Sequence, residues 1–309
     1  MPMEMVKRVI PDHAHQFYDF EPHYLTINGF RYHYIDEGQG EPIILLHGNP
    51  SWSFMYRRLI NALRPEYRVI APDHIGCGLS DKPESDKYDY SLAQRVVDLE
   101  QLLDTLGVSA DITLVMHDWG GPIGMGYAGR HVQAINRLVV LNTAAFLPPG
   151  GKRFHWSLRI GRTRPFGLLL IRGFNLMVLG AAYLGFRNSP RDVRRCYGAP
   201  YNSWRNRISV FRFVQDIPLA PTDRSYPLLK CIEQKLSHFQ QIPVLICWGE
   251  RDFVFDTDFL EEWIRRFPVA EVYRFPNAGH YVLEDSGDAI IPLMQSFLHK
   301  HVKRTALSD

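Results

Sequence analysis

The stretch at residues 112–121 constrains the fold more than any other part of this sequence. It begins with Ile-Thr-Leu-Val-Met, an apolar run with β-branched residues that predicts a buried strand. Asp118 follows two residues later, and the pair Gly120-Gly121 then opens a helical pattern. A side chain at so sharp a strand-to-helix turn is pushed outward above the sheet. The stretch therefore predicts an exposed carboxylate at the end of a central strand, with helix capping as the alternative role for Asp118.

Strand and helix patterns alternate on both sides of this turn. Two β-rich runs at 24–27 and 30–35 flank Asn28-Gly29, a strong signal for an antiparallel hairpin. Short apolar runs of the kind buried in parallel sheets lie at 42–46, 67–71, 112–116, 137–141, 243–248 and 271–275. Helical patterns lie at 54–63, 92–106, 121–132, 258–267 and 290–299. The alternation predicts an α/β fold with a mostly parallel, doubly wound sheet.

The alternation is interrupted between residues 148 and 235, which predicts a helical cap inserted into a core formed by 1–147 and 236–309. Between Leu147 and Ser225 fourteen basic residues face only three acidic ones, a local charge of +11 in a chain of net charge +2. Two interpretations stay open: contact with an anionic lipid surface, protein or substrate head group, and a solvated face with internal salt bridges.

An apolar stretch at 166–186 has the length of a membrane span. Arg172, Asn175 and four glycines interrupt it, so the sequence favours helices packed over an apolar pocket. A surface for homo-oligomer formation or for membrane or protein contact is the second interpretation.

Composition narrows the function classes further. With 46% hydrophobic and 22% charged residues, the 309-residue chain can bury a large core. The four cysteines are widely spaced without a C-x-x-C pair, which is typical of reduced thiols rather than of disulfides or a zinc site. The first fifteen residues contain no apolar run, so a cytoplasmic protein is expected. No phosphate loop or nucleic-acid motif is present, and we expect no metal or organic cofactor.

Asp118 is followed in the sequence by an acid and then a histidine. A catalytic triad whose nucleophile stands at such a strand-to-helix turn has this order along the chain. Asp252 follows the strand at 243–248, and His280 follows the strand at 271–275. His280 is predicted to be the general base for water, with Asp252 fixing its tautomer. The neighbouring acids are interpreted as surface or helix-capping residues: Glu250, Asp256 and Asp258. The strand at 137–141 is followed by Asn142-Thr143-Ala-Ala, which offers no carboxylate.

The tetrapeptide His47-Gly48-Asn49-Pro50 follows the strand at 42–46. At this place the main-chain N–H of Asn49 and that of Trp119, the residue after Asp118, are predicted to form an oxyanion hole. The side-chain amide of Asn49 and the indole of Trp119 are also donors that can converge on one anion beside Asp118. Plain packing is the less favoured role for Trp119.

These motifs together resemble the haloalkane dehalogenase family of α/β-hydrolases. The likeness rests on H-G-N-P at 47–50, D-H-I-G-C-G-L-S-D at 73–81, H-D-W-G at 117–120 and A-G-H at 278–280. The turn is similar to the nucleophile elbow G-x-S-x-G, with Asp118 in place of serine and Met116 in place of the first glycine. The position of the acid and the Asn-Trp pair resemble the third subfamily. That subfamily also holds decarboxylases of cis-β-lactones from bacterial olefin biosynthesis, to which 252–255 and 280–285 are particularly similar.

The resemblance implies an α/β-hydrolase fold and, first, a haloalkane dehalogenase. Asp118 would displace halide from a small hydrophobic substrate, Asn49 and Trp119 would bind the halide ion, and His280 with Asp252 would drive hydrolysis of the alkyl ester. Decarboxylation of a cis-β-lactone to a cis-alkene is the alternative. Epoxide hydrolysis is the second alternative, because H-D-W-G-G is shared with epoxide hydrolases, whose cap tyrosines protonate the ring oxygen. The candidate cap tyrosines are Tyr183, Tyr197 and Tyr201. A non-enzymatic scaffold is disfavoured because all members of the triad are present.

Overall fold

The computed structural model describes residues 17–151, 156–186 and 189–302. An eight-stranded sheet runs in the order β1-β2-β4-β3-β5-β6-β7-β8. The strands are β1 His23–Ile27, β2 Phe30–Glu37, β3 Pro42–Leu46, β4 Arg68–Pro72, β5 Ile112–Asp118, β6 Ile135–Thr143, β7 Val244–Gly249 and β8 Glu271–Phe275. β2 is antiparallel to β1 and to β4, and all other pairings are parallel. The predicted fold class is therefore confirmed.

The opening hairpin is built as its sequence predicts. Ile27 pairs with Phe30 across a two-residue turn. Asn28 and Gly29 have φ values of 50° and 82°, and positive φ at both central residues is the geometry that matches the twist of a hairpin. The turn therefore fixes the register of the first two strands.

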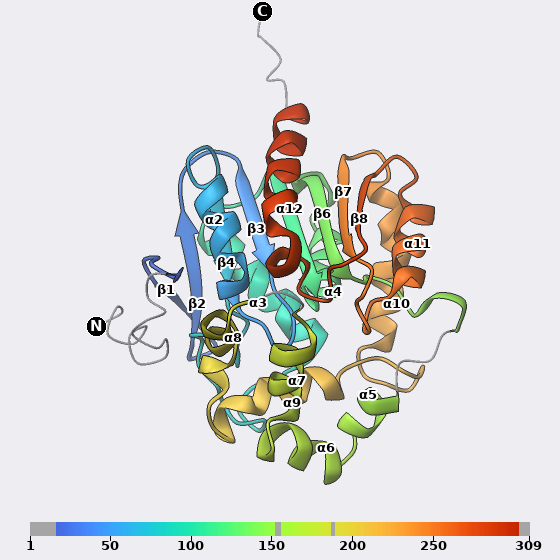
Figure 1. Cartoon of the computed structure of the whole chain (residues 1–309). Coiled ribbons are helices and arrows are strands. Elements are labelled where there is room, and N and C mark those ends of the chain that lie inside the picture. The colour runs from blue at the N-terminus through green and yellow to red at the C-terminus, as the bar shows by residue number, and fades with distance from the viewer. Residues whose placement is uncertain (1–16, 152–155, 187–188, 303–309) are drawn as a thin grey trace, which may run out of the picture.

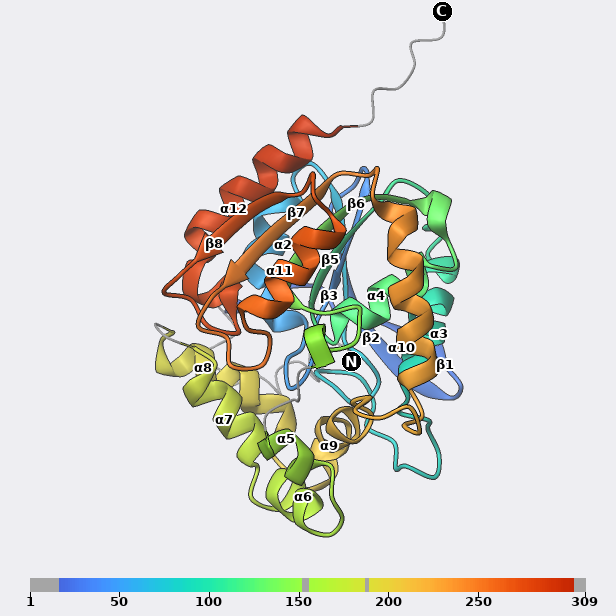
Figure 2. The same cartoon turned by 90° about the vertical axis from the view of Figure 1, so that its right-hand side faces the viewer.

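Helices cover both faces of the sheet (Figures 1 and 2). One face carries α2 Arg57–Leu63 and α12 Val282–Lys300, and the other carries α3 Leu92–Thr105, α4 Gly120–Ala128, α10 Tyr226–Lys235 and α11 Thr257–Arg266. Alternate residues of the central strands feed these two apolar cores, which explains why the strands read as continuous apolar runs. Three predicted helices differ from the structure by more than one residue, and the other two differ by no more than one residue at either end. The helix at 54–63 opens as a 3₁₀ turn, that at 121–132 stops before Gly129, and the last helix begins at Val282 with Pro292 inside it.

The remaining helices lie beyond the carboxyl ends of the parallel strands (Figure 1). They are α5 Trp156–Gly161, α6 Phe166–Leu168, the π-helical turn η5 Leu169–Gly173, α7 Leu176–Leu184, α8 Arg191–Gly198, the 3₁₀ turns η6 Ala199–Tyr201 and η7 Arg205–Arg207, and α9 Ile208–Gln215. α10 instead packs against α4. The division of the chain into core and cap at residues 148 and 235 stays a prediction.

Within the part of the chain that the structure describes, no single helix is long and apolar enough to cross a membrane. Only the pair Phe166–Gly173 and Leu176–Tyr183 reaches that length and composition, and the two segments are bent by 59°. The break lies at Asn175, whose φ of 59° is left-handed, a conformation that asparagine tolerates.

Candidate active site

The elbow at Asp118 is strained and tightly packed. Its φ of 50° lies in the left-handed region, which is costly for a residue with a side chain. A Cβ atom on Gly120 would lie 2.0 Å from the carbonyl oxygen of Leu46, and one on Gly121 would lie 2.0 Å from the hydroxyl of Thr143. α4 can therefore start this close to β3 and β6 only with glycine at both positions. Thr143 also donates a hydrogen bond to the carbonyl of Asp118, which holds the turn in place.

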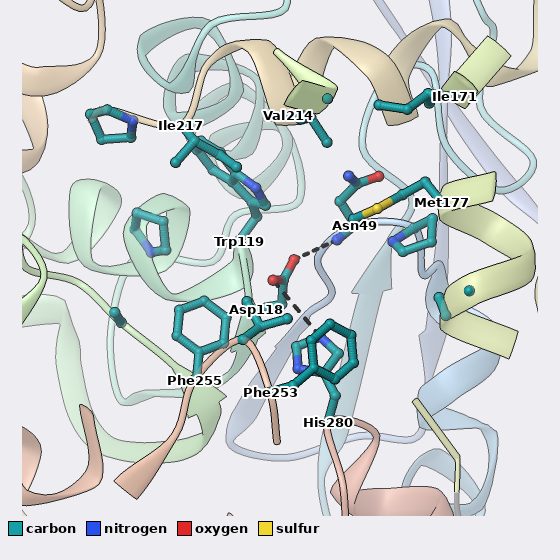
Figure 3. A pocket seen from close by; sticks show the side chains of 18 of the residues that line it. Asn49, Asp118, Trp119, Ile171, Met177, Val214, Ile217, Phe253, Phe255 and His280 are labelled. Carbon is teal, nitrogen blue, oxygen red and sulfur yellow. Dashed lines mark hydrogen bonds and ion pairs between the residues drawn. The ribbon is translucent and has the colours of Figure 1, made fainter. Parts of the chain in front are cut away.

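The two oxygens of the Asp118 carboxylate have different surroundings (Figure 3). Oδ1 accepts a hydrogen bond from the main-chain N–H of Asn49 at 2.6 Å, and the main-chain N–H of Trp119 also donates to the carboxylate. Oδ2 lies 3.8 Å from Nε2 of His280. A Cβ atom on Gly48 would fall 2.0 Å from Oδ1, so the loop must carry glycine there. The main-chain N–H of Asn49 thus holds Oδ1 in place, and Oδ2 is the oxygen that can attack a substrate.

The prediction that the Asp118 carboxylate is exposed is wrong, because the cap covers the turn and only 6% of this residue is exposed. Burial raises the pKa of Asp118. The charge of His280 and the main-chain N–H groups of Asn49 and Trp119 lower it, and together they do not fully offset the burial. The carboxylate therefore depends on its neighbours to remain ionised.

His280 reaches the site from the loop after β8. Its Nδ1 lies 2.7 Å from Oδ2 of Asp252, which makes Nδ1 the protonated nitrogen and turns Nε2 towards Asp118. Nε2 of His117 lies 2.8 Å from the carbonyl oxygen of His280, so β5 also holds this loop. Burial lowers the pKa of His280, but the charge and hydrogen bond of Asp252 and the charge of Asp118 raise it more. The net pKa lies above the usual value.

Asn142, at the end of β6, has a role that the sequence did not reveal. Its side-chain amide donates to Oδ2 of Asp252 at 3.0 Å and exchanges two hydrogen bonds with the main chain of Gly249. Oδ1 of Asp252 accepts the N–H of Val254 at 2.7 Å. The carboxyl end of β6 therefore supplies an amide that orients the acid. The only sequence signal was a polar residue directly after a buried strand.

The neighbouring acids take other roles. Glu250 pairs with Arg274 at 3.3 Å on the surface, and Asp256 caps the start of α11. The interpretation of these two residues as surface and capping acids is confirmed. Asp258 lies in the first turn of the same helix.

Asn49 and Trp119 lie on the same side of the carboxylate (Figure 3). The Asn49 amide donates one hydrogen bond to the carbonyl of Val210 at 3.2 Å, which leaves its second N–H for a ligand. Trp119 packs on Phe213, with ring centroids 5.2 Å apart. The buried guanidinium of Arg95 also lies over the Phe213 ring, 3.5 Å from its centroid. The joint binding of an anion by Asn49 and Trp119 stays a prediction.

A cavity of about 400 Å³ opens above the carboxylate. Only four of its lining residues have a side chain with polar atoms, and the others are apolar or glycine. The four are Asn49, Asp118, Trp119 and His280. Ile171 of η5 and Met177 of α7 cover the cavity from the cap side (Figure 3). The predicted arrangement of helices over an apolar pocket is confirmed, and all polar chemistry is concentrated at one end of it.

The cap tyrosines do not reach this cavity. Tyr197 donates its hydroxyl to Glu284 at 2.7 Å, Tyr201 donates to the carbonyl of Ser51 at 2.8 Å, and Tyr183 is 66% exposed. None of the three lines the cavity. The structure therefore removes the proton donors on which the epoxide hydrolase hypothesis depended.

Comparison with known proteins gives a family and two groups of relatives. The α/β hydrolase fold family matches residues 41–286. A cis-3-alkyl-4-alkyloxetan-2-one decarboxylase from Shewanella oneidensis is 52% identical over 90% of this chain and 88% of its own length. One from Xanthomonas campestris is 46% identical over 92% and 98%. Haloalkane dehalogenase 2 of Mycobacterium tuberculosis is 30% identical over 89% and 94%.

Solved structures support the same fold. Haloalkane dehalogenase DbeA from Bradyrhizobium elkani superposes with a TM-score of 0.82 over 91% of this chain and 98% of that one, at 24% identity. The family match covers most of the chain, and the decarboxylase and dehalogenase relatives align along nearly its whole length. The chain belongs to the α/β-hydrolase fold family.

Proposed function

We propose that this protein decarboxylates cis-3,4-dialkyl oxetan-2-ones, which are β-lactones, to cis-alkenes and carbon dioxide. The observation that carries the proposal is the identity of 52% and 46% to two decarboxylases of this kind along nearly the whole chain. The dehalogenase relatives reach 30% to 34%. The motifs alone favour dehalogenation, and the comparisons favour its alternative, decarboxylation of a β-lactone.

The cavity suits such a substrate. A dialkyl β-lactone has one small polar ring and two apolar chains, and the cavity has one polar end in an otherwise apolar wall. Burying the chains supplies binding free energy of roughly 0.8 kcal/mol per methylene. The ring would then lie beside Asp118, where the polar groups are.

The geometry of Asp118 supports a two-step reaction without water. Oδ2 attacks C4 of the ring from the side opposite the ring oxygen, while Oδ1 stays bound to the N–H of Asn49. The C4–O bond breaks, and its electron pair completes a carboxylate on C3. The bond from C3 to this carboxylate then breaks, its electrons form the C3=C4 double bond, and the C4–Oδ2 bond breaks. Carbon dioxide leaves and the Asp118 carboxylate is restored.

The stereochemistry is consistent with this route. Inversion at C4 places the new ester oxygen anti to the carboxylate on C3, the arrangement that elimination requires. Anti elimination then keeps the two alkyl groups on the same side, so a cis-lactone gives a cis-alkene.

The other polar groups have roles in this scheme. The Trp119 indole and the second N–H of the Asn49 amide stabilise the carboxylate that forms on C3. The His280 imidazolium, oriented by Asp252, favours the ionised form of Asp118 both as nucleophile and as leaving group. Asn142 keeps Asp252 in position.

Haloalkane dehalogenation is the second candidate, because the same four polar side chains line the cavity and His280 lies near the carboxylate. In that reaction Asp118 displaces a halide, and His280 activates water to cleave the alkyl ester. The two reactions differ in one respect that can be measured: dehalogenation inserts an oxygen atom of water into Asp118.

The test is to incubate the purified protein separately with a synthetic cis-β-lactone, its trans isomer and 1-bromobutane. We expect cis-alkene from the cis-lactone, measured by gas chromatography with mass spectrometry, and no alkene with Asp118→Ala. After turnover of the lactone in ¹⁸O-water the peptide containing Asp118 should carry no label. Bromide release without alkene formation would refute the proposal and establish the second candidate.

A further inference from the structure

An apolar surface lies exposed at the end of the molecule formed by α6, η5 and α7. Figures 1 and 2 both show α6 at the opposite end of the molecule from the carboxyl end of α12. Six large apolar side chains, five on these three elements and one in the break between η5 and α7, are between 44% and 69% exposed. They are Phe166, Leu169, Phe174, Leu176, Leu179 and Tyr183, and we call them the cap-tip surface. A group of large exposed apolar side chains on neighbouring elements marks a contact site.

The cap-tip surface continues into the cavity. Leu176 is 51% exposed and also lines the cavity, as does Phe253, which is 60% exposed. On the inner side of α7, Met177 and Ala181 line the cavity as well. α7 is therefore apolar on the face towards the cavity and on the face towards the outside. A helix that is apolar all round belongs in apolar surroundings on both sides.

The charge beside this surface is positive. No Asp or Glu occurs between residues 148 and 191 of the sequence. Among the described residues four arginines of the basic segment pair with acids, so the salt-bridge interpretation holds for these four: Arg162 with Asp223, Arg172 with Glu84, Arg195 with Asp192 and Arg224 with Asp89. Arg159, Arg164 and Arg205 are exposed, and none forms a salt bridge with a residue that the structure describes. Arg164 lies two residues before the start of α6, and Arg205 follows Trp204, a further exposed aromatic residue.

We propose that the cap-tip surface docks on an anionic phospholipid bilayer. The apolar side chains enter the boundary between head groups and hydrocarbon, and the three arginines bind the anionic head groups. Leu176 and Phe253 then present the entrance of the cavity to the hydrocarbon. Under the proposed function, a substrate with two alkyl chains and its alkene product would pass between bilayer and cavity without crossing water.

The structure favours docking over spanning. The two helical segments are bent by 59° and neither is long enough to cross by itself. Arg172 is 8% exposed, donates to the carbonyl of Trp204 at 3.1 Å and lies over its ring, which fixes η5 to η7. Pulling the pair into a straight span would break these contacts. An interfacial position leaves them intact.

The experiment measures co-sedimentation of the full chain with vesicles of phosphatidylglycerol and phosphatidylcholine, compared with vesicles of phosphatidylcholine alone. We expect binding to the anionic vesicles that weakens at about 1 M salt, where the Debye length is roughly 3 Å. Arg159→Gln with Arg164→Gln should weaken binding about fivefold for each arginine. Phe166→Ser with Phe174→Ser should weaken it at least about tenfold.

The matched controls change exposed residues elsewhere on the molecule. Val269→Ser replaces a 73% exposed apolar side chain, and Lys300→Gln removes a basic side chain that is 62% exposed. Both should bind anionic vesicles like the wild type. Circular dichroism verifies the fold of each variant, and the arginine pair tests the proposal even if the phenylalanine pair fails to fold.

Two results would overturn the proposal. One is the absence of binding to anionic vesicles, or binding that none of these substitutions changes. The other is a dimer in light scattering that the phenylalanine substitutions convert to monomer without any vesicle binding, since a second copy would then cover the surface. None of the substituted residues lines the cavity. A wild type that binds the vesicles but forms no alkene would therefore count against the proposed function and not against docking.

Discussion

Replacing His280 with glutamine separates the two reactions proposed for this site. An alkyl ester left on Asp118 by a halide must be cleaved by water, and that step needs a base. An ester formed from a β-lactone carries its own carboxylate, and loss of carbon dioxide releases it without water. Glutamine provides an N–H donor for Asp252 but no basic nitrogen.

The structure sets different magnitudes for the two reactions. Without its base, halide turnover should fall by roughly 10²- to 10⁴-fold while the alkyl ester accumulates. For the lactone, His280 contributes only a contact of 3.8 Å to Oδ2, which is longer than a hydrogen bond. Such a contact contributes less than one charge-assisted hydrogen bond, so the loss should stay below about 1.5 kcal/mol, or roughly tenfold. The N–H of Asn49 still anchors Oδ1.

The assay follows alkene formation, bromide release and the intact mass of the protein after exposure to 1-bromobutane. His131→Gln, at a partly exposed histidine bound to Glu100, is the matched control and should behave like the wild type. If the lactone reaction falls as steeply as halide turnover, His280 acts as a base in decarboxylation and the route without water is wrong. If the wild type releases bromide and the variant gains no mass, His280 acts before the ester forms.

Four further expectations concern the same site. Asp118→Ala should abolish alkene formation, and retention of more than about a hundredth of the wild-type rate, or a loss of under ~2.7 kcal/mol, would contradict its role as nucleophile. Trp119→Phe keeps an aromatic ring but loses the indole donor, so the rate of alkene formation should fall about ten- to hundredfold. Quenching of tryptophan fluorescence by bromide should weaken as well. No change in either measurement would refute the anion site. Asn142→Leu leaves Asp252 without its amide donor and should lower the free energy of unfolding by about 1–3 kcal/mol in chemical denaturation, together with the rate; a wild-type rate would deny it a positioning role. Asp118 acts in its ionised form and its pKa is raised, so the rate should fall on acidification at a higher pH than it would with an ordinary aspartate. His280→Gln removes a positive charge and should move this acidic fall in the rate to a still higher pH. An unchanged pH dependence in that variant would disprove the coupling between the two residues.

The sheet was predictable because its signals are local. Apolar runs, the Asn28-Gly29 turn and the glycines after Asp118 each act over a few neighbouring residues, and the structure places all of them as expected. The helix ends were less predictable, because Pro292 inside α12 hid the true start of that helix.

The support of the site depends on contacts between distant parts of the chain. Asn142 and Asp252 are 110 positions apart, and Arg95 reaches Trp119 only through Phe213. No spacing rule connects such residues before the chain folds. The motifs also could not decide between the two candidate reactions, because dehalogenases and lactone decarboxylases share them.

The same coupling explains what a histidine–aspartate pair does in a reaction that needs no water. Asp118 is buried beneath an apolar cavity, and burial favours its protonated, unreactive form. The positive charge of His280 opposes this effect, and Asp252 in turn favours the protonated imidazole. In a dehalogenase the imidazole must also accept a proton from the water that attacks the ester. With a lactone it only has to keep the carboxylate ionised, because the leaving group stays attached and completes the reaction itself. Under the proposed function the substrate decides the fate of the ester. The same five side chains would then serve either reaction: Asn49, Asp118, Trp119, Asp252 and His280.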